Sequence, residues 1–197
     1  MTAVKVCGLM TPADVALVNR VHPDYAGFVL AAGRHQVSPK HALALAAGLA
    51  AGITPVAVVV APDLDQLAKL RPGITTVQLH RPAAPSLVAA LHALGFTVFA
   101  RVTAEQPTTT ADLALLDAGD GSGQTLDWHH LPRVNRPLML AGGLDGGNVQ
   151  AAIACTHPAL VDASSRLETK GRKDAAKVQA FVVAVRETER NFSDVKR

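Results

Sequence analysis

Short apolar runs alternate with longer segments of helical periodicity along almost the whole chain, and this alternation limits the folds that it can adopt. Eight runs have the length and β-branched content of buried strands: residues 3–7, 25–30, 55–60, 75–79, 97–102, 113–116, 138–141 and 159–163. Strands that alternate with helices are joined by crossover connections, which produce a parallel sheet covered by helices. The sequence therefore predicts an α/β fold.

Helices are predicted between most of these strands, over residues 12–21, 39–51, 64–70, 84–94, 147–154 and 174–189. The first has the clearest start, because Thr11 can serve as N-cap, Pro12 takes the first helical position and Asp14 completes a capping box. Two further helices should be weak. The segment after Val102 contains three consecutive threonines, and two prolines interrupt the segment after Trp128. We therefore expect one or two helices to be shortened or missing.

Two architectures fit this pattern, a doubly wound open sheet and a closed (β/α)8 barrel. A repeat of about 25 residues places eight strand–helix units in a chain of 197 residues, which favours the barrel. Such barrels usually have about 250 residues, so this one would be compact. Residues 1–190 are predicted to form a single-domain TIM barrel, and residues 191–197 a charged C-terminal tail.

The composition excludes several kinds of partner. The 19 Lys and Arg against 16 Asp and Glu give a formal net charge of +3, and the basic residues are scattered. This gives no electrostatic indication of nucleic-acid or membrane binding. The two cysteines, Cys7 and Cys155, lie far apart without metal-ligand spacing, and no signal peptide or membrane-spanning apolar run is recognisable. We expect a cytoplasmic protein with free thiols and no metal site.

Chemically reactive side chains gather where the predicted strands end. Cys7 ends the first strand, Arg34 follows the second, His80 ends the fourth, and Asp117 and Asp162 end the sixth and eighth. Active sites of (β/α)8 barrels lie at the carboxyl ends of the strands. A buried cysteine is often a small core residue, but core packing gives no reason for reactive groups to gather at one end. The strand ends are therefore the candidate active site.

The last two strands end in a pattern that suits a phosphate. Gly142 and Gly143 follow the seventh strand, and Ser164 and Ser165 follow the eighth. Glycines let backbone N–H groups approach an anion, serine hydroxyls add donors, and the loops after strands seven and eight of barrels often bind phosphate. Gly142-Gly143 alone could be a plain turn, but beside the paired serines phosphate binding is favoured.

Five motifs in order give the chain a specific resemblance. They are KVCGL at 5–9, VQLH at 77–80, DGSG at 120–123 with LDW at 126–128, LAGGL at 140–144 with NV at 148–149, and DASS at 162–165 with KD at 173–174. Over essentially the whole chain, their order and spacing resemble the phosphoribosylanthranilate isomerase family of tryptophan biosynthesis, whose members are (β/α)8 barrels.

The resemblance implies a cofactor-free Amadori rearrangement of a phosphosugar, N-(5-phosphoribosyl)anthranilate. By carry-over, Cys7 is the general base and Asp127 the general acid. The thiol must then be partly ionised, and the carboxyl group must keep its proton near neutral pH. Lys5 shares the side of the strand with Cys7 only if the strand stays regular.

The resemblance also implies the substrate contacts. Gly142, Gly143, Ser164 and Ser165 would hold the phosphate, Asp162 the ribose hydroxyls, and Arg34 the anthranilate carboxylate, a role that suits a bidentate guanidinium; His80 would line the same face. Three positions depart from the family pattern. His35 stands in the register of the family's arginine and could replace Arg34, while Arg81 and Arg166 stand at usual glycine positions.

Two other functions remain open at this point. The chain could be another phosphosugar isomerase or epimerase on the same barrel, or a weakly active phosphate-binding relic left by the changes at Arg81 and Arg166. An isomerase of the related histidine pathway typically uses two aspartates, and Cys7 occupies the place of one of them. The expected assembly is a monomer or a homodimer.

Overall fold

The computed structural model describes residues 1–118 and 124–194 of the chain. Eight parallel strands close into a barrel, in which each strand pairs with the next and the last pairs with the first. In chain order they are β1 (Ala3–Cys7), β2 (Tyr25–Val29), β3 (Thr54–Val59), β4 (Thr76–Leu79), β5 (Thr97–Arg101), β6 (Leu113–Asp117), β7 (Leu138–Ala141) and β8 (Leu160–Ala163). The prediction of a single-domain (β/α)8 TIM barrel is therefore confirmed.

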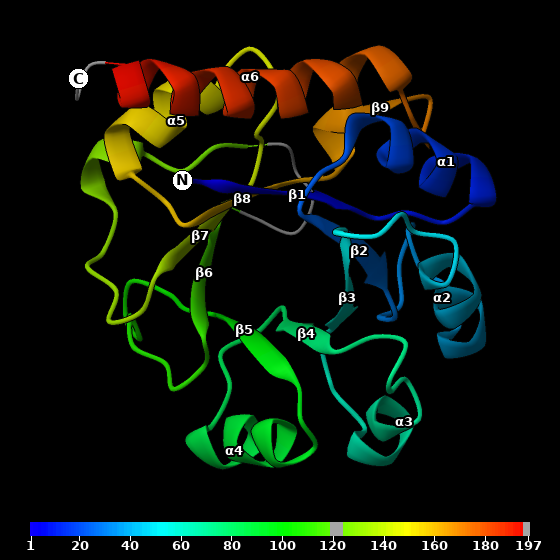
Figure 1. Ribbon diagram of the computed structural model, residues 1–197. Coiled ribbons are helices and arrows are strands. Elements are labelled where there is room, and N and C mark those ends of the chain that lie inside the picture. The colour runs from blue at the N-terminus through cyan, green and yellow to red at the C-terminus, as the bar shows by residue number, and fades with distance from the viewer. Residues whose placement is uncertain (119–123, 195–197) are drawn as a thin grey trace.

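Helices surround the barrel, as Figure 1 shows. They are α1 (Pro12–Val21), α2 (Pro39–Ala46), α3 (Leu64–Ala68), α4 (Pro85–Ala93), α5 (Val149–Thr156) and α6 (Ala175–Asp194). Two 3-10 turns, η1 (Trp128–His130) and η2 (Ser165–Leu167), and a small antiparallel hairpin of β9 (Glu168–Thr169) and β10 (Arg172–Lys173) complete the fold. None of the helices in the described ranges is both long and apolar enough to span a membrane.

Two crossovers depart from the regular pattern, where the sequence predicts weak helices. The connection between β5 and β6 contains no helix, and the described part of the connection between β6 and β7 contains only η1. Polar turn formers and proline disfavour helix in both segments. The expectation of one or two missing helices is confirmed.

The C-terminal helix runs further than expected. α6 continues to Asp194, past the predicted boundary at residue 190, so at least the first part of the expected tail is helical. The remaining positions, 195–197, lie outside the described residues. The division into a domain of residues 1–190 and a tail stays a prediction.

The first helix begins as its sequence predicts. The Thr11 side chain accepts a hydrogen bond from the Asp14 backbone N–H at 3.2 Å, and the Asp14 carboxylate accepts from the Thr11 N–H at 2.9 Å. This capping box satisfies backbone donors that the first turn of a helix leaves unpaired. It therefore fixes where the chain leaves β1 and begins α1.

Strand alternation divides the buried residues into two sets. Residues such as Val4 and Val6 pack outward under the helices, whereas Lys5 and Cys7 point into the barrel. The barrel interior is apolar near its middle, with Phe99 and Met139 among its members. At the carboxyl ends of the strands the inward positions become polar. This change from apolar to polar creates a lined cavity at one end of the barrel.

Candidate active site

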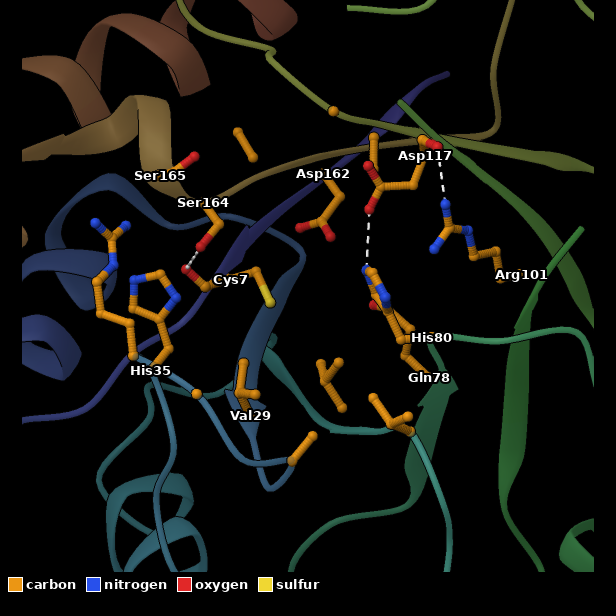
Figure 2. A pocket seen from close by; sticks show the side chains of 18 of the residues that line it. Cys7, Val29, His35, Gln78, His80, Arg101, Asp117, Asp162, Ser164 and Ser165 are labelled. Carbon is orange, nitrogen blue, oxygen red and sulfur yellow. Dashed lines mark hydrogen bonds and ion pairs between the residues drawn. The ribbon is translucent and has the colours of Figure 1, made fainter. Parts of the chain in front are cut away.

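A cavity of about 650 Å³ opens at the carboxyl ends of the barrel strands. Its walls come from the ends of all eight barrel strands and from the loop after β2. Of the residues that the sequence predicts for the site, all but one line this cavity: Cys7, Arg34, His80, Asp162, Gly142, Gly143, Ser164 and Ser165. The structure therefore brings nearly the whole predicted set together, as Figure 2 shows for most of it.

Cys7 is the last residue of β1 and is only 6% exposed. Gly27 lies opposite it on β2, and a Cβ atom at Gly27 would lie 2.6 Å from the Cys7 sulfur. Only a glycine leaves room for the thiol at this point. After Cys7 the chain turns at Gly8, whose φ of +76° suits glycine. Burial raises the pKa of Cys7, and the nearby Lys5 ammonium opposes that shift.

Lys5 and Asp162 form a buried ion pair below the cavity. The Lys5 ammonium is fully buried and donates to Asp162 Oδ2 at 2.9 Å. The other carboxylate oxygen, Oδ1, is buried and has no hydrogen-bond partner among the described residues. Because β1 is regular, Lys5 and Cys7 share the inward side of the strand. The Asp162 carboxylate is therefore held through Oδ2, while Oδ1 is buried without a partner among the described residues.

Asp117 and His80 face each other across the cavity. Nε2 of His80 lies 3.0 Å from Oδ2 of Asp117, and both side chains are largely buried. A Cβ atom at Gly142 would lie 3.0 Å from Asp117 Oδ1, so the carboxylate also sits beside the first glycine of the predicted phosphate loop. Arg101 Nη2 makes a long contact of 3.5 Å with the Asp117 carbonyl oxygen. Figure 2 shows this carboxyl group and Cys7 around the same space.

The predicted phosphate residues form one wall. Gly142 and Gly143 have φ values of +93° and +64°, a conformation that favours glycine. Ser164 and Ser165 stand at the start of η2. The Ser164 hydroxyl donates to the Cys7 carbonyl oxygen at 3.1 Å, which links this wall to β1. Arg166, at a usual glycine position, also lines the cavity.

Glu168 joins the loop after β2 to the hairpin after β8. Its carboxylate contacts Arg34 Nη2, His35 Nε2 and Lys173 Nζ, each at 2.7 Å. The Glu168 side chain is only 4% exposed, whereas that of Arg34 is 58% exposed and that of His35 is 15% exposed. Burial alone would raise the pKa of Glu168, but its three basic neighbours outweigh burial and lower it. Arg34 and His35 are thus fixed beside the cavity by one carboxylate.

Sequence reasoning gave no role to Lys5, Glu168 or Lys173. Lys5 and Lys173 lie within matched motifs, but a motif does not reveal a side-chain partner. Glu168 follows the buried Leu167. Its short spacing to Lys173 is the sequence feature that could have indicated a local ion pair. The contact with Arg34 joins residues 134 positions apart, which no local pattern could reveal.

Asp127 is the exception among the predicted site residues. It is not among the described residues that line the cavity, and its side chain is 65% exposed. Its carboxylate accepts from the His129 backbone N–H at 3.1 Å and contacts His130 Nδ1 at 2.7 Å, as the N-cap of η1. The hydrogen bond from His130 and that from the His129 backbone lower the pKa of Asp127. The role of Asp127 as general acid stays a prediction.

Other predicted features have less consequence. The motif at residues 120–123 lies outside the described residues, while Gln124, which follows it, lines the cavity. Arg81 lines the cavity rim. In the described part of the chain, His, Cys, Asp and Glu side chains form no cluster of three that could hold a metal ion. Both cysteines are free.

The family model and the relatives that match this chain identify the same family. Residues 4–184 match the family model of N-(5'-phosphoribosyl)anthranilate (PRA) isomerase. The N-(5'-phosphoribosyl)anthranilate isomerase of Lacticaseibacillus casei is 42% identical over 192 residues, which cover 95% of this chain and 96% of the relative. That of Lactiplantibacillus plantarum is 40% identical over 195 residues, with 95% and 94% covered.

Solved structures agree with this family. The TrpF protein of Jonesia denitrificans superposes with a TM-score of 0.83 at 32% identity, over 96% of this chain and 98% of that protein. Phosphoribosyl anthranilate isomerase of Thermus thermophilus gives a TM-score of 0.79 at 26% identity, with 95% and 99% covered. The shared barrel, the shared sequence and the near-complete coverage lead to one conclusion: the chain belongs to the N-(5'-phosphoribosyl)anthranilate isomerase family of tryptophan biosynthesis.

Proposed function

We propose that this protein converts N-(5-phosphoribosyl)anthranilate to 1-(2-carboxyphenylamino)-1-deoxyribulose 5-phosphate, with Cys7 as general base and Asp117 as general acid. The observation that carries the proposal is a thiol and a carboxyl group that face one cavity from β1 and β6. An Amadori rearrangement needs a proton donor and a proton acceptor on the same sugar. A structurally similar isomerase (TM-score 0.78, 23% identity) is in complex with reduced 1-(o-carboxyphenylamino)-1-deoxyribulose 5-phosphate.

The acid opens the sugar ring. Asp117 donates a proton to the furanose ring oxygen, the bond from C1 to that oxygen breaks, and the nitrogen lone pair forms a C1=N double bond. His80, whose Nε2 lies 3.0 Å from Asp117 Oδ2, orients the carboxyl group. We assign the acid to Asp117 and not to Asp127, because Asp117 lines the same cavity as Cys7, whereas Asp127 is not among the described residues that line it.

The base then acts on the open chain. The Cys7 thiolate removes the C2 proton, the electron pair of that C–H bond forms a C1=C2 double bond, and the π pair of C1=N returns to nitrogen. The resulting enolamine loses its hydroxyl proton and gains a proton at C1, which gives the ketone. Each step is a proton transfer or a rearrangement within the substrate, so the scheme needs no cofactor.

Anchors on both sides of the acid and base hold the substrate. The N–H groups at Gly142 and Gly143 and the hydroxyls of Ser164 and Ser165 suit the phosphate. On the other side Arg34 or His35 suits the anthranilate carboxylate. The Asp162 carboxylate, which lines the cavity between them, suits a ribose hydroxyl. Binding at both ends leaves the reacting carbons between Cys7 and Asp117.

The assembly and location stay predictions. The phosphoribosylanthranilate isomerase of Thermotoga maritima is described as dimeric, at 24% identity and a TM-score of 0.77. We expect this protein to be a monomer or a homodimer, which light scattering would decide, and to act in the cytoplasm.

The deciding experiment follows the fluorescence of freshly generated N-(5-phosphoribosyl)anthranilate, coupled to the next enzyme of the pathway. The wild-type protein should turn the substrate over, and Cys7→Ser should be at least about 100-fold slower, because a serine hydroxyl does not ionise near neutral pH. Binding without turnover by a folded wild-type protein would favour the phosphate-binding relic. Turnover of a different phosphosugar alone would favour the other isomerases and epimerases.

A further inference from the structure

Three buried groups meet below the cavity, on the inward side of β1 and its neighbours. Lys5 and Cys7 lie on β1, and Asp162 lies beside Lys5 on β8. The Lys5 ammonium is fully buried, so every N–H that it offers is directed at protein atoms. One of these donates to Asp162 Oδ2 at 2.9 Å. An ammonium group has three donors, so Asp162 does not exhaust it.

The Cys7 sulfur is the second group that the ammonium meets. A Cβ atom at Gly27 would lie 2.6 Å from the Cys7 sulfur and 3.0 Å from Lys5 Nζ. Sulfur and nitrogen therefore converge on the space that Gly27 leaves open. The positive charge of Lys5 opposes the rise that burial causes in the pKa of Cys7. A cation close to a buried sulfur favours the thiolate over the thiol.

Other polar and charged groups lie around the triad of Lys5, Cys7 and Asp162. Lys173 on β10 acts on Cys7 from the side of the phosphate wall. Asp117 on β6 and His80, which directly follows β4, act on Asp162. Tyr25 lies next to Lys5 on β2, and His35 lies beside Gly8. Among these groups, Lys5 is the cation that is paired with the Asp162 carboxylate and lies near the Cys7 sulfur.

We propose that Lys5 is the positioning residue of the isomerisation: its ammonium group stabilises the Cys7 thiolate and, with another N–H, holds the Asp162 carboxylate in place by Oδ2. This inference rests on the proposed function, because it assigns the group that supports its base. Lys5 keeps its proton throughout. When the thiolate takes the C2 proton, the triad changes from a net charge of −1 to zero, and the ammonium remains paired with Asp162.

A titration of the Cys7 thiol tests the inference without any need for turnover. The background is Cys155→Ser, which leaves Cys7 as the single thiol. The rate of iodoacetamide alkylation is measured against pH by mass spectrometry, and the ultraviolet absorbance of the thiolate is measured in parallel, with Cys7→Ser as the blank. The variants are Lys5→Met, Asp162→Asn and both together. The double variant keeps similar side-chain volumes and leaves no unpaired buried charge.

The inference predicts opposite shifts for the two single changes. Asp162→Asn should lower the midpoint of the Cys7 titration, because the Lys5 charge is then no longer balanced. Lys5→Met should raise the midpoint by about one pH unit or more, a tenfold slower alkylation at a fixed pH below it. If Lys5→Met alone does not fold, the double variant provides the test. The midpoint of its Cys7 titration should also lie above that of the Cys155→Ser parent.

The opposing result is equally clear. If Lys5 serves only to neutralise Asp162, the double variant will titrate as the parent does, and the inference is then wrong. A different result is expected if the proposed function, and not the inference about Lys5, is wrong. In that case the wild-type protein would not convert N-(5-phosphoribosyl)anthranilate, while the shift of the Cys7 midpoint in the Lys5 variants would remain.

Discussion

At the scale of single residues, two aspartates differ in what they can do. Asp117 faces the cavity beside His80, whereas Asp127 caps a 3-10 turn and is 65% exposed. The sequence motif that contains Trp128 indicates Asp127 as the acid. A sequence motif identifies a position, but it does not show where the side chain at that position points. A general acid must reach the substrate, and Asp117 lines the cavity that Cys7 also lines.

Matched substitutions separate these two carboxylates. Asp117→Asn should lower kcat by about 100-fold or more, the contribution typical of general acid catalysis, because the amide cannot donate the proton. Asp127→Asn, the same change at an exposed position, should leave kcat within about twofold. Steady-state kinetics on both variants check this. The reverse order of effects would return the acid to Asp127.

The Cys7 thiol should titrate at high pH. Burial is the largest influence and raises its pKa, so at neutral pH most molecules carry the thiol and not the thiolate. In the Cys155→Ser variant, alkylation should therefore become about tenfold faster per pH unit through neutrality and should still increase beyond about pH 8.5, the ordinary thiol value. Alkylation rates that level off below about pH 8 would contradict this environment.

At the scale of elements, the hairpin of β9 and β10 holds the loop after β2 in place. Glu168 on β9 contacts Lys173 on β10 and both Arg34 and His35 on that loop. The Lys173–Glu168 pair is almost fully buried, with side-chain exposures of 2% and 4%. These contacts connect the side of the cavity assigned to the carboxylate with the side assigned to the phosphate.

Removal of the Glu168 charge should loosen both sides. Glu168→Gln leaves Lys173 buried without its counter-ion, a change that typically costs about 3 kcal/mol. We expect a lower midpoint of thermal unfolding and a raised KM, since Arg34 and His35 lose their common anchor. Differential scanning calorimetry and steady-state kinetics measure these effects. Glu105→Gln, which removes the same charge from an exposed loop, is the control and should change neither quantity.

The elements themselves were largely predictable from sequence. Strand β7 and helix α1 have the bounds that periodicity and capping predict, because burial on a sheet or under a helix imposes those patterns. Helix α2 ends at Ala46, earlier than the predicted residue 51, although alanine and leucine continue beyond it. Propensity does not show where a chain must turn toward its next strand, since tertiary packing determines that point.

At the scale of the whole molecule, the barrel explains why most of the site was predictable. Parallel strands place their carboxyl ends at one edge, so residues at strand ends meet although they are far apart in sequence. Cys7 and Ser164, 157 positions apart, are hydrogen-bonded for this reason. The sequence does not show which side chains contact each other at the carboxyl ends of the strands. The Lys5–Asp162 pair and the contact of Glu168 with Arg34 depend on barrel closure and register.

A ligand that occupies the phosphate wall should stabilise the whole barrel, because the wall is built from β7, β8 and η2 and is joined to β1. Inorganic phosphate, which should compete with substrate, is the probe. At a concentration 100 times its Kd, binding to the folded state alone adds about 2.7 kcal/mol. For a chain of this size that corresponds to an increase of about 5–10 °C in Tm.

A charge substitution distinguishes specific binding from a general effect of salt. Ser165→Asp places a negative charge in the wall and should abolish both the competition and the increase in Tm, because like charges repel at short range. Ser86→Asp makes the same change on the exposed surface of α4 and should keep both. If phosphate raises the Tm of the two variants equally, the anion acts through the solvent, and Gly142, Gly143, Ser164 and Ser165 do not form the phosphate site.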